Sequence, residues 1–304
     1  MSASLTHTTV AMDTVVTIQV IDQGTTSAEQ MHRDAAVERA LGWFRAIESH
    51  CTRFDPVSEL RVLCTQVGRP VSASAVLIET VRFAIALAEE TDGAFDPTVG
   101  RRMEARGFDR NYKTGKSSAT GEGAGDASYR DVYVDAIANT ITLDRPLLLD
   151  LGAVAKGFAI DMAARELAEF EHFAIDAGGD LFLAGRNEQG EPWSIGIRHP
   201  RDDDQLLESL TVSNAAVCTS GDYERRQPGT GHHIVDPETG DAALQLASVT
   251  VIAPIAMVAD GLATAAFVLG PKRGLALLER HGVRGILVTP TLDRYATADA
   301  ATLL

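Results

Sequence analysis

The chain has 304 residues, of which 45% are hydrophobic and 23% are charged, as in an ordinary globular protein. Its formal net charge of −15 argues against nucleic acid or an anionic membrane surface as a partner. A phosphate ligand would therefore have to be held by local features, and a divalent cation would help to hold it.

The N-terminal third is predicted to contain one strand and two helices. Ser27 and Gln30 match the capping-box pattern at a helix start, and clusters of Asp, Gly and Pro mark the loops. The elements expected here are a strand over 15–20, a helix from 27 to about 50, a loop over 52–58, a helix over 74–90 and a turn-rich loop over 91–100.

The middle of the chain is predicted to begin with a loop and to end in a strand–helix unit. Residues 111–128 are rich in Gly, Ser, Ala and charge, which predicts an exposed or flexible loop. A hairpin is expected over 132–143, turning near Asn139. An apolar run over 147–151, interrupted only by Asp150, predicts a buried strand, and a helix is expected from 156 to 169.

The C-terminal half is predicted to be rich in strands, over 173–175, 181–184, 193–198, 210–212, 216–219, 248–253, 285–289 and 294–296. A helix over 259–269 should close at Gly270, and Pro271 can open the next helix. Helices near the start and many strands later indicate an α+β fold with antiparallel-rich sheets. No repeat or clear linker divides the chain, which predicts a single domain over 1–304.

The segment 149–169 carries the first candidate site. Asp150 is predicted to end a strand and Lys156 to lie at the start of the following helix. Backbone N–H groups at a helix start favour an anion, so a lysine there predicts a phosphate site. The spacing of glycines fits neither a Walker loop nor a dinucleotide fingerprint. A plain turn with a surface lysine is the alternative.

Asp260 and Thr264 form the second candidate site. They are four residues apart at a predicted helix start and therefore project from one face. A carboxylate and a hydroxyl are hard oxygen ligands suited to Mg²⁺. The alternative is structural, with an aspartate that complements the helix dipole and a threonine that bonds back to the helix.

Two adjacent histidines, His232 and His233, precede the turn over 236–240. Imidazole can ligate a metal or accept a proton near neutral pH, although no third ligand is spaced for zinc. The alternative is that at least one histidine is merely exposed. Thr219 and Ser220 could bind phosphate or shape a turn.

The cysteines and the N-terminus bear on the compartment. Cys51, Cys64 and Cys218 fit no zinc pattern and are too few for a disulfide framework. The N-terminal residues show neither a signal peptide nor a cysteine for lipid attachment, and no apolar run is long enough to span a membrane. These features predict a cytoplasmic protein without a membrane anchor.

Taken in order, the motifs resemble the ApbE family, the FAD:protein FMN transferases, over nearly the whole chain. The matching segments are AMDTVVTIQV, RFDPVSEL, TDGAFDPTVG, LDLGAVAKGFAID, DAGGDLFLAG, WSIGIRHP, VCTSGDYERR, HHIVDPETG and ADGLATAAFVLG. One departure is Asp13, which stands where glycine is frequent. The resemblance implies a single ApbE-type, T-fold-like domain of two lobes, with antiparallel-rich sheets and flanking helices.

The resemblance also implies a reaction, in which FMN passes from FAD to a threonine or serine hydroxyl of a flavoprotein acceptor and AMP is released. It assigns Mg²⁺ to Asp260, Thr264 and the backbone carbonyl of Ala153, and a catalytic role to His233. We expect His233 to act as general base, with an orienting role as the second interpretation. The residues implied to contact FAD are Met12, Phe54, Ala94, Phe95, Asp96, Asp150, Lys156 and Val235.

Two other functions share these motifs. An FAD pyrophosphatase would use water in place of the acceptor hydroxyl and needs the same metal and lysine. A non-catalytic FAD-binding protein would have no need of Asp260, Thr264 and His233 together.

Overall fold

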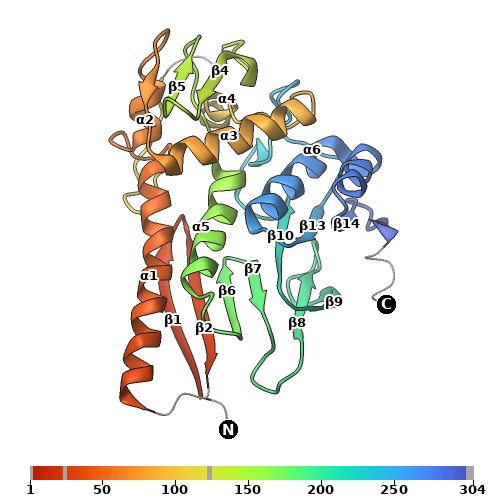
Figure 1. Ribbon diagram of the computed structural model, residues 1–304. Coiled ribbons are helices and arrows are strands. Elements are labelled where there is room, and N and C mark those ends of the chain that lie inside the picture. Colours follow the sequence, from red (N-terminus) through yellow and green to blue (C-terminus); the bar gives the residue numbers. More distant parts are fainter. Residues whose placement is uncertain (1–2, 23–25, 122–124, 299–304) are drawn as a thin grey trace.

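One sheet of eight strands forms the centre of the computed structural model (Figure 1). Its order is β1-β2-β6-β7-β10-β13-β14-β15, and each adjacent pair is antiparallel. The bounds are β1 Ala3–Ala11, β2 Thr14–Asp22, β6 Phe173–Ala177, β7 Asp180–Ala184, β10 Ala215–Gly221, β13 Ser248–Ala253, β14 Arg284–Val288 and β15 Arg294–Ala296. The structure describes residues 3–22, 26–121 and 125–298.

Three helices cover one face of this sheet: α1 (Ser27–Cys51), α5 (Gly152–Glu166) and α6 (Ala256–Arg280). Helix α1 contacts β1 and β2, α5 contacts β6 and β7, and α6 lies on β10 and β13. Alternate side chains of a strand point to one face, so Ile18 of β2 is fully buried in the same core as Phe44 of α1. None of the described helices is both long and apolar enough to cross a membrane.

The opposite face of the sheet is covered at one end by a two-stranded ribbon, β8 (Trp193–Arg198) and β9 (Leu206–Val212). Ile197 and Leu210 of the ribbon pack with Leu183, Val217 and Ile286 in a second core.

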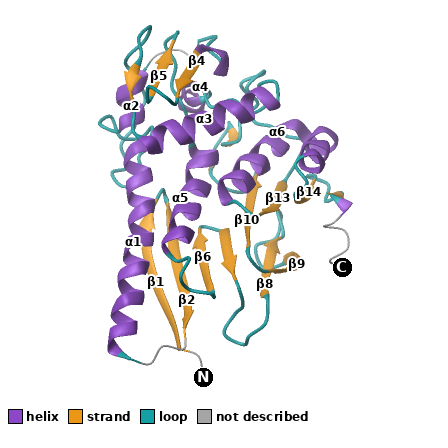
Figure 2. Cartoon of the chain, in the orientation of Figure 1, coloured by secondary structure: helices purple, strands orange, loops and turns teal. Residues whose placement is uncertain are grey.

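Away from this ribbon lies a smaller sheet, visible at the top of Figures 1 and 2. Its order is β3-β5-β4. The remaining elements are β3 Val71–Ser72, β4 Val132–Asp135, β5 Thr140–Leu143, β11 Arg226–Gln227, β12 Gly231–His232, α2 Glu59–Cys64, α3 Ala75–Glu90, α4 Gly100–Ala105 and the 3₁₀ turn Tyr129–Asp131. The predicted α+β class with antiparallel sheets is confirmed.

Several boundaries differ from the sequence prediction. The capping box of α1 begins at Thr26, whose side chain accepts from the Glu29 N–H, and not at Ser27. Strand β1 was not predicted, because its residues alternate weakly in hydropathy and it is held as an edge strand by pairing with β2. Helices α2 and α4 were not predicted either, because six residues each are too few to show a helical period.

The segment before α5 is a correction. Residues 147–151 form no strand, because Leu148 makes a single isolated bridge to Val99. Helix α5 begins at Gly152, so Lys156 lies one turn inside the helix and not at its start. Helix α6 begins at Ala256, and the predicted break at Gly270 is present as a kink with φ 76°.

The predicted loop over 111–128 lies partly outside the described residues, since 122–124 are not described. Its first residues are tied to α1 and to the loop after it. The Asn111 side chain donates to the Phe54 carbonyl at 3.1 Å, and Lys113 forms an ion pair with Glu48 at 2.8 Å. The flexibility of this loop stays a prediction.

Candidate active site

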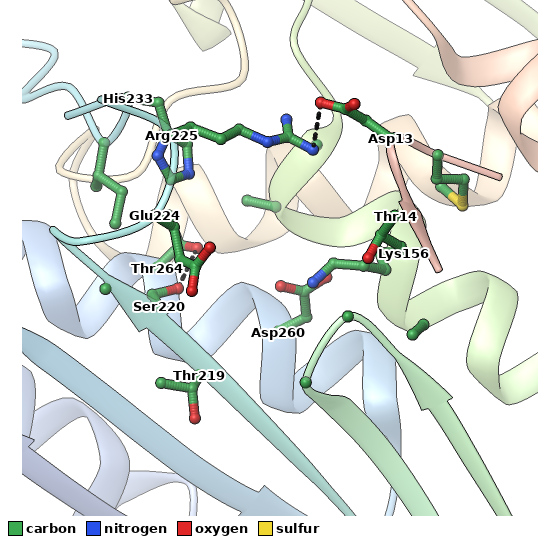
Figure 3. A pocket seen from close by; sticks show the side chains of 18 of the residues that line it. Asp13, Thr14, Lys156, Thr219, Ser220, Glu224, Arg225, His233, Asp260 and Thr264 are labelled. Carbon is green, nitrogen blue, oxygen red and sulfur yellow. Dashed lines mark hydrogen bonds and ion pairs between the residues drawn. The ribbon is translucent and has the colours of Figure 1, made fainter. Parts of the chain in front are cut away.

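One cavity of about 980 Å³ opens between the main sheet, the β8–β9 ribbon, α5, α6 and the segments before and after α4. Its walls include every residue that the family resemblance assigned to a site, namely Met12, Phe54, Ala94, Phe95, Asp96, Asp150, Ala153, Lys156, His233, Val235, Asp260 and Thr264. The fold therefore brings together residues from the first β-turn to the last long helix (Figure 3).

Helices α5 and α6 meet at a glycine. A Cβ added to Gly157 would lie 2.5 Å from the Ala256 carbonyl oxygen and 2.6 Å from the Met257 Cα, so only glycine allows this approach. One turn later, the Asp161 carboxylate accepts from the backbone N–H groups of Ala256 at 2.7 Å and Met257 at 2.9 Å. Asp161 thus caps the start of α6 from α5.

This helix contact places Asp260 beside the first turn of α5. The Gly157 N–H donates to the Asp260 carboxylate at 3.1 Å. In an α-helix that N–H also points at the carbonyl of residue 153, so Asp260 and the Ala153 carbonyl converge on one amide. The Thr264 hydroxyl lies 2.9 Å from the Ser220 hydroxyl, on the same wall. These oxygen donors fit a hard divalent cation.

Lys156 lies between two buried carboxylates. It forms a close ion pair with Asp180, which also accepts from the Thr219 N–H at 2.9 Å. Burial opposes its charge, but Asp180 and Asp260 outweigh burial and raise the pKa of Lys156. Burial, then the charge of Asp180, raises the pKa of Asp260 to about 8. A cation bound here would offset the repulsion between the Asp180 and Asp260 carboxylates.

Asp150 is bound by a residue that sequence reasoning missed. Arg53, whose side chain is 2% exposed, forms a close ion pair with it and donates to the Phe108 carbonyl at 2.6 Å. Burial would raise the pKa of Asp150, but the Arg53 charge and hydrogen bond lower it overall. The Arg53 guanidinium also lies 4.1 Å from the centre of the Phe54 ring. Asp150 and Phe54 are therefore held by one arginine.

The two histidines have different surroundings. His232 is 3% exposed, lies 2.8 Å from the Ala243 carbonyl through Nε2 and packs edge-on against Phe267, as a core residue does. His233 lines the cavity, and its Nδ1 is buried without a hydrogen-bond partner in the described chain. Burial and the charge of Arg225 lower the pKa of His233 to about 3. Its imidazole is therefore neutral near pH 7.

Asp96 has a structural task on the cavity wall. Its Oδ1 accepts from the N–H and hydroxyl of Thr98, at 2.8 and 2.7 Å, and its Oδ2 accepts from the Tyr129 N–H at 3.1 Å. Met12 occupies the turn between β1 and β2 with φ 54°. Phe95 and Val235 are buried beside the cavity.

Three residues that the sequence analysis did not assign complete the site: Arg53, Asp180 and Arg225. Arg53 and Asp180 lie within the RFDP and AGGD motifs, so the motifs were found but their buried ion pairs were not. Among the described residues, no cluster of three or more His, Cys, Asp or Glu side chains could hold a metal. The set implied for Mg²⁺ has one carboxylate and would not form such a cluster.

Comparisons of the sequence with known proteins all lead to one family. A sequence model described as the ApbE family matches residues 12–287. An FAD:protein FMN transferase of Haemophilus influenzae is 28% identical over 95% of this chain and 88% of that protein. One of Treponema pallidum is 35% identical over 80% of this chain and 73% of that protein.

The fold also matches solved structures of ApbE proteins. An ApbE protein from Thermotoga maritima superposes with a TM-score of 0.85 at 29% identity, covering 99% of both chains. The flavin transferase ApbE from Vibrio cholerae gives a TM-score of 0.85 at 27% identity, covering 100% of both chains.

Proposed function

The chain belongs to the ApbE family, and we propose that it transfers FMN from FAD to a threonine or serine hydroxyl of a flavoprotein, with Mg²⁺ bound and AMP released. The relatives named above are FAD:protein FMN transferases, and the match extends over nearly the whole chain.

One observation carries the proposal. Asp260, Lys156 and His233 come from three separate segments and line one cavity, in which Lys156 is charged and His233 is neutral near pH 7. The cavity volume of about 980 Å³ is at the upper end for small-molecule sites, which suits a dinucleotide. A passive flavin carrier has no use for a neutral histidine whose Nδ1 lacks a partner in the described chain, in the same cavity as a buried carboxylate.

The chemistry is substitution at phosphorus. The acceptor oxygen forms a bond to the FMN phosphorus, and the bond from that phosphorus to the bridging oxygen breaks, so AMP leaves. His233 takes the hydroxyl proton in this proposal, which is supported by its Nδ1 having no hydrogen-bond partner in the described chain. The Lys156 ammonium offsets charge on the phosphate oxygens.

Asp260, Thr264 and the Ala153 carbonyl would hold Mg²⁺. The convergence of Asp260 and residue 153 on the Gly157 amide supports this set. When bound there, Mg²⁺ would neutralise diphosphate oxygens and stabilise the charge that develops during transfer.

The test is intact-protein mass spectrometry of a candidate flavoprotein after incubation with this chain, FAD and Mg²⁺. A gain of one FMN on a threonine or serine is expected. His233→Gln should slow labelling by about 10²- to 10⁴-fold while FAD still binds, and Asp260→Asn should remove the Mg²⁺ dependence. The matched control is His281→Gln, on a histidine that pairs with Glu90 and does not line the cavity.

Three results would contradict parts of the proposal. Free FMN and AMP without labelling would identify a pyrophosphatase, and FAD that stays intact with Mg²⁺ would identify a binding protein. A wild-type labelling rate in His233→Gln would remove that residue from the base role.

A further inference from the structure

Arg225 lies on the cavity wall and has no place in the mechanism above. It ends the connection between β10 and β11, and its guanidinium extends past His233 towards the turn between β1 and β2 (Figure 3). Its φ of 22° is in the left-handed region, which arginine rarely adopts. Strained residues of this kind cluster at active sites, ligand clamps and switch regions.

Asp13 is the partner of Arg225 on the other side. It sits in the β1–β2 turn with φ 62°, and its carboxylate lies 3.4 Å from the Arg225 guanidinium. The two side chains are 46% and 47% exposed, so the ion pair is open to solvent. Exposed pairs of this kind contribute little free energy, so a better anion can displace the carboxylate.

The other cations near His233 are held differently. Lys156 is bound to Asp180, whose side chain is 3% exposed, and Arg53 is bound to Asp150, whose side chain is 15% exposed. Within the described chain, Asp13 is the one carboxylate within 4 Å of Arg225. Arg225 is therefore the cation of this group that can most readily change its partner.

The position of Arg225 points to the ligand group it would take. Its charge acts both on Asp150, just before α5, and on His233. A diphosphate between the start of α5 and His233 would thus lie within its field. A planar guanidinium can bind two phosphate oxygens at once.

We propose that Arg225 binds the diphosphate of the dinucleotide, and that Asp13 holds its guanidinium only while the cavity is empty. This inference rests on the proposed function, because it takes FAD as the ligand. Arg225 exchanges the Asp13 carboxylate for phosphate oxygens when the ligand enters, which adds a positive charge beside the reacting phosphorus.

The test compares the affinities of three probes in Mg²⁺-containing buffer, by calorimetry or fluorescence. FAD carries both halves of the ligand, ADP carries the diphosphate without the flavin, and riboflavin carries the flavin without phosphate. Arg225→Gln should weaken FAD and ADP binding about tenfold or more and leave riboflavin binding unchanged. Arg225→Lys should recover part of the loss.

Asp13→Asn tests the other part of the proposal, that the Asp13 carboxylate competes with phosphate for Arg225. Asparagine tolerates the left-handed conformation as aspartate does, so the turn is kept. Removing the competing carboxylate should tighten ADP binding by about two- to fivefold. The same change in an Arg225→Gln background should have no effect on ADP binding. The matched control is Arg82→Gln, on an exposed arginine of α3 that pairs with Glu79.

The proposal is overturned if Arg225→Gln binds ADP as tightly as the wild type, or if it loses riboflavin binding to the same extent as ADP binding. The second result would indicate a structural role. These measurements need no acceptor protein, so they can fail while FMN transfer is observed. A wild-type chain that binds FAD but labels no acceptor would contradict the proposed function alone.

Discussion

Asp13 shows how a residue can replace glycine in the first motif of the family. Its backbone φ is 62°, a conformation that glycine adopts without strain and that aspartate tolerates better than most residues. The β1–β2 turn is thus kept, and a carboxylate is gained at the mouth of the cavity. The departure noted in the sequence has a conformational explanation and supplies a partner for Arg225.

His233 gives a prediction on pH. Because its pKa is lowered to about 3, its protonated form becomes abundant only as the pH approaches that value. With Mg²⁺ high enough to keep Asp260 ionised across the range, we therefore expect kcat/KM for FMN transfer to stay level from about pH 8 to about pH 5, whereas a histidine of ordinary pKa would give a decline near 6.5.

The measurement is kcat/KM across this range, with circular dichroism at each pH to verify the fold. A decline centred near pH 6.5 in a folded enzyme would mean that the base is not held neutral as the structure indicates.

The pairing of α5 with α6 sets the geometry of the metal and lysine side of the cavity. Lys156 and Ala153 lie on α5, while Asp260 and Thr264 lie on α6. The helices are held together at Gly157 and Asp161, so small changes there should move the two halves of the site apart.

Gly157→Ala tests this contact. The added Cβ meets backbone atoms of α6 that cannot rotate away, so the helices must separate. Overpacking of this kind typically lowers the free energy of unfolding by about 1–3 kcal/mol. We expect a lower denaturation midpoint and weaker Mg²⁺-dependent FAD binding.

Gly42→Ala is the matched control, because a Cβ at Gly42 in α1 meets nothing within 4 Å. Alanine at an open helix position should raise stability by about 0.5–1 kcal/mol. If both variants change stability in the same direction, close packing is not the reason for glycine at 157.

At the scale of the whole molecule, the cavity joins segments that are distant in sequence. Its walls run from the β1–β2 turn through α5 and the histidine turn to α6. A ligand that contacts all of them should stabilise the entire fold, since it binds only the native arrangement.

We expect FAD with Mg²⁺ to raise Tm. At a free FAD concentration about 100 times Kd the stabilisation is about 2.7 kcal/mol, which corresponds to a few degrees for a chain of this size. Differential scanning calorimetry with and without EDTA separates the two ligands. Asp260→Asn should lose the part of the increase that EDTA removes and keep the rest, and an unchanged response to EDTA in this variant would exclude Asp260 as a metal ligand.

Much of the fold was predictable because its signals are local. The helix over 74–90, the hairpin turning at Asn139 and the break at Gly270 depend on periodicity and turn residues within a few positions. The prediction failed where no local pattern exists. Strand β1 alternates only weakly in hydropathy, although it pairs with β2 across a two-residue turn. The leucines of 147–151 are apolar because they are buried, not because they join a sheet.

By itself, the sequence determined the family and predicted candidate site residues, because the types and order of the motifs suffice for that. Only the tertiary structure decided their partners. Arg53 meets Asp150 across 97 positions and the Gly157 amide meets Asp260 across 103. Burial obliges a carboxylate to find a cation or a donor, but which one it meets depends on how α5, α6 and the sheet pack. The charge states of Lys156, His233 and Asp260 follow from that packing.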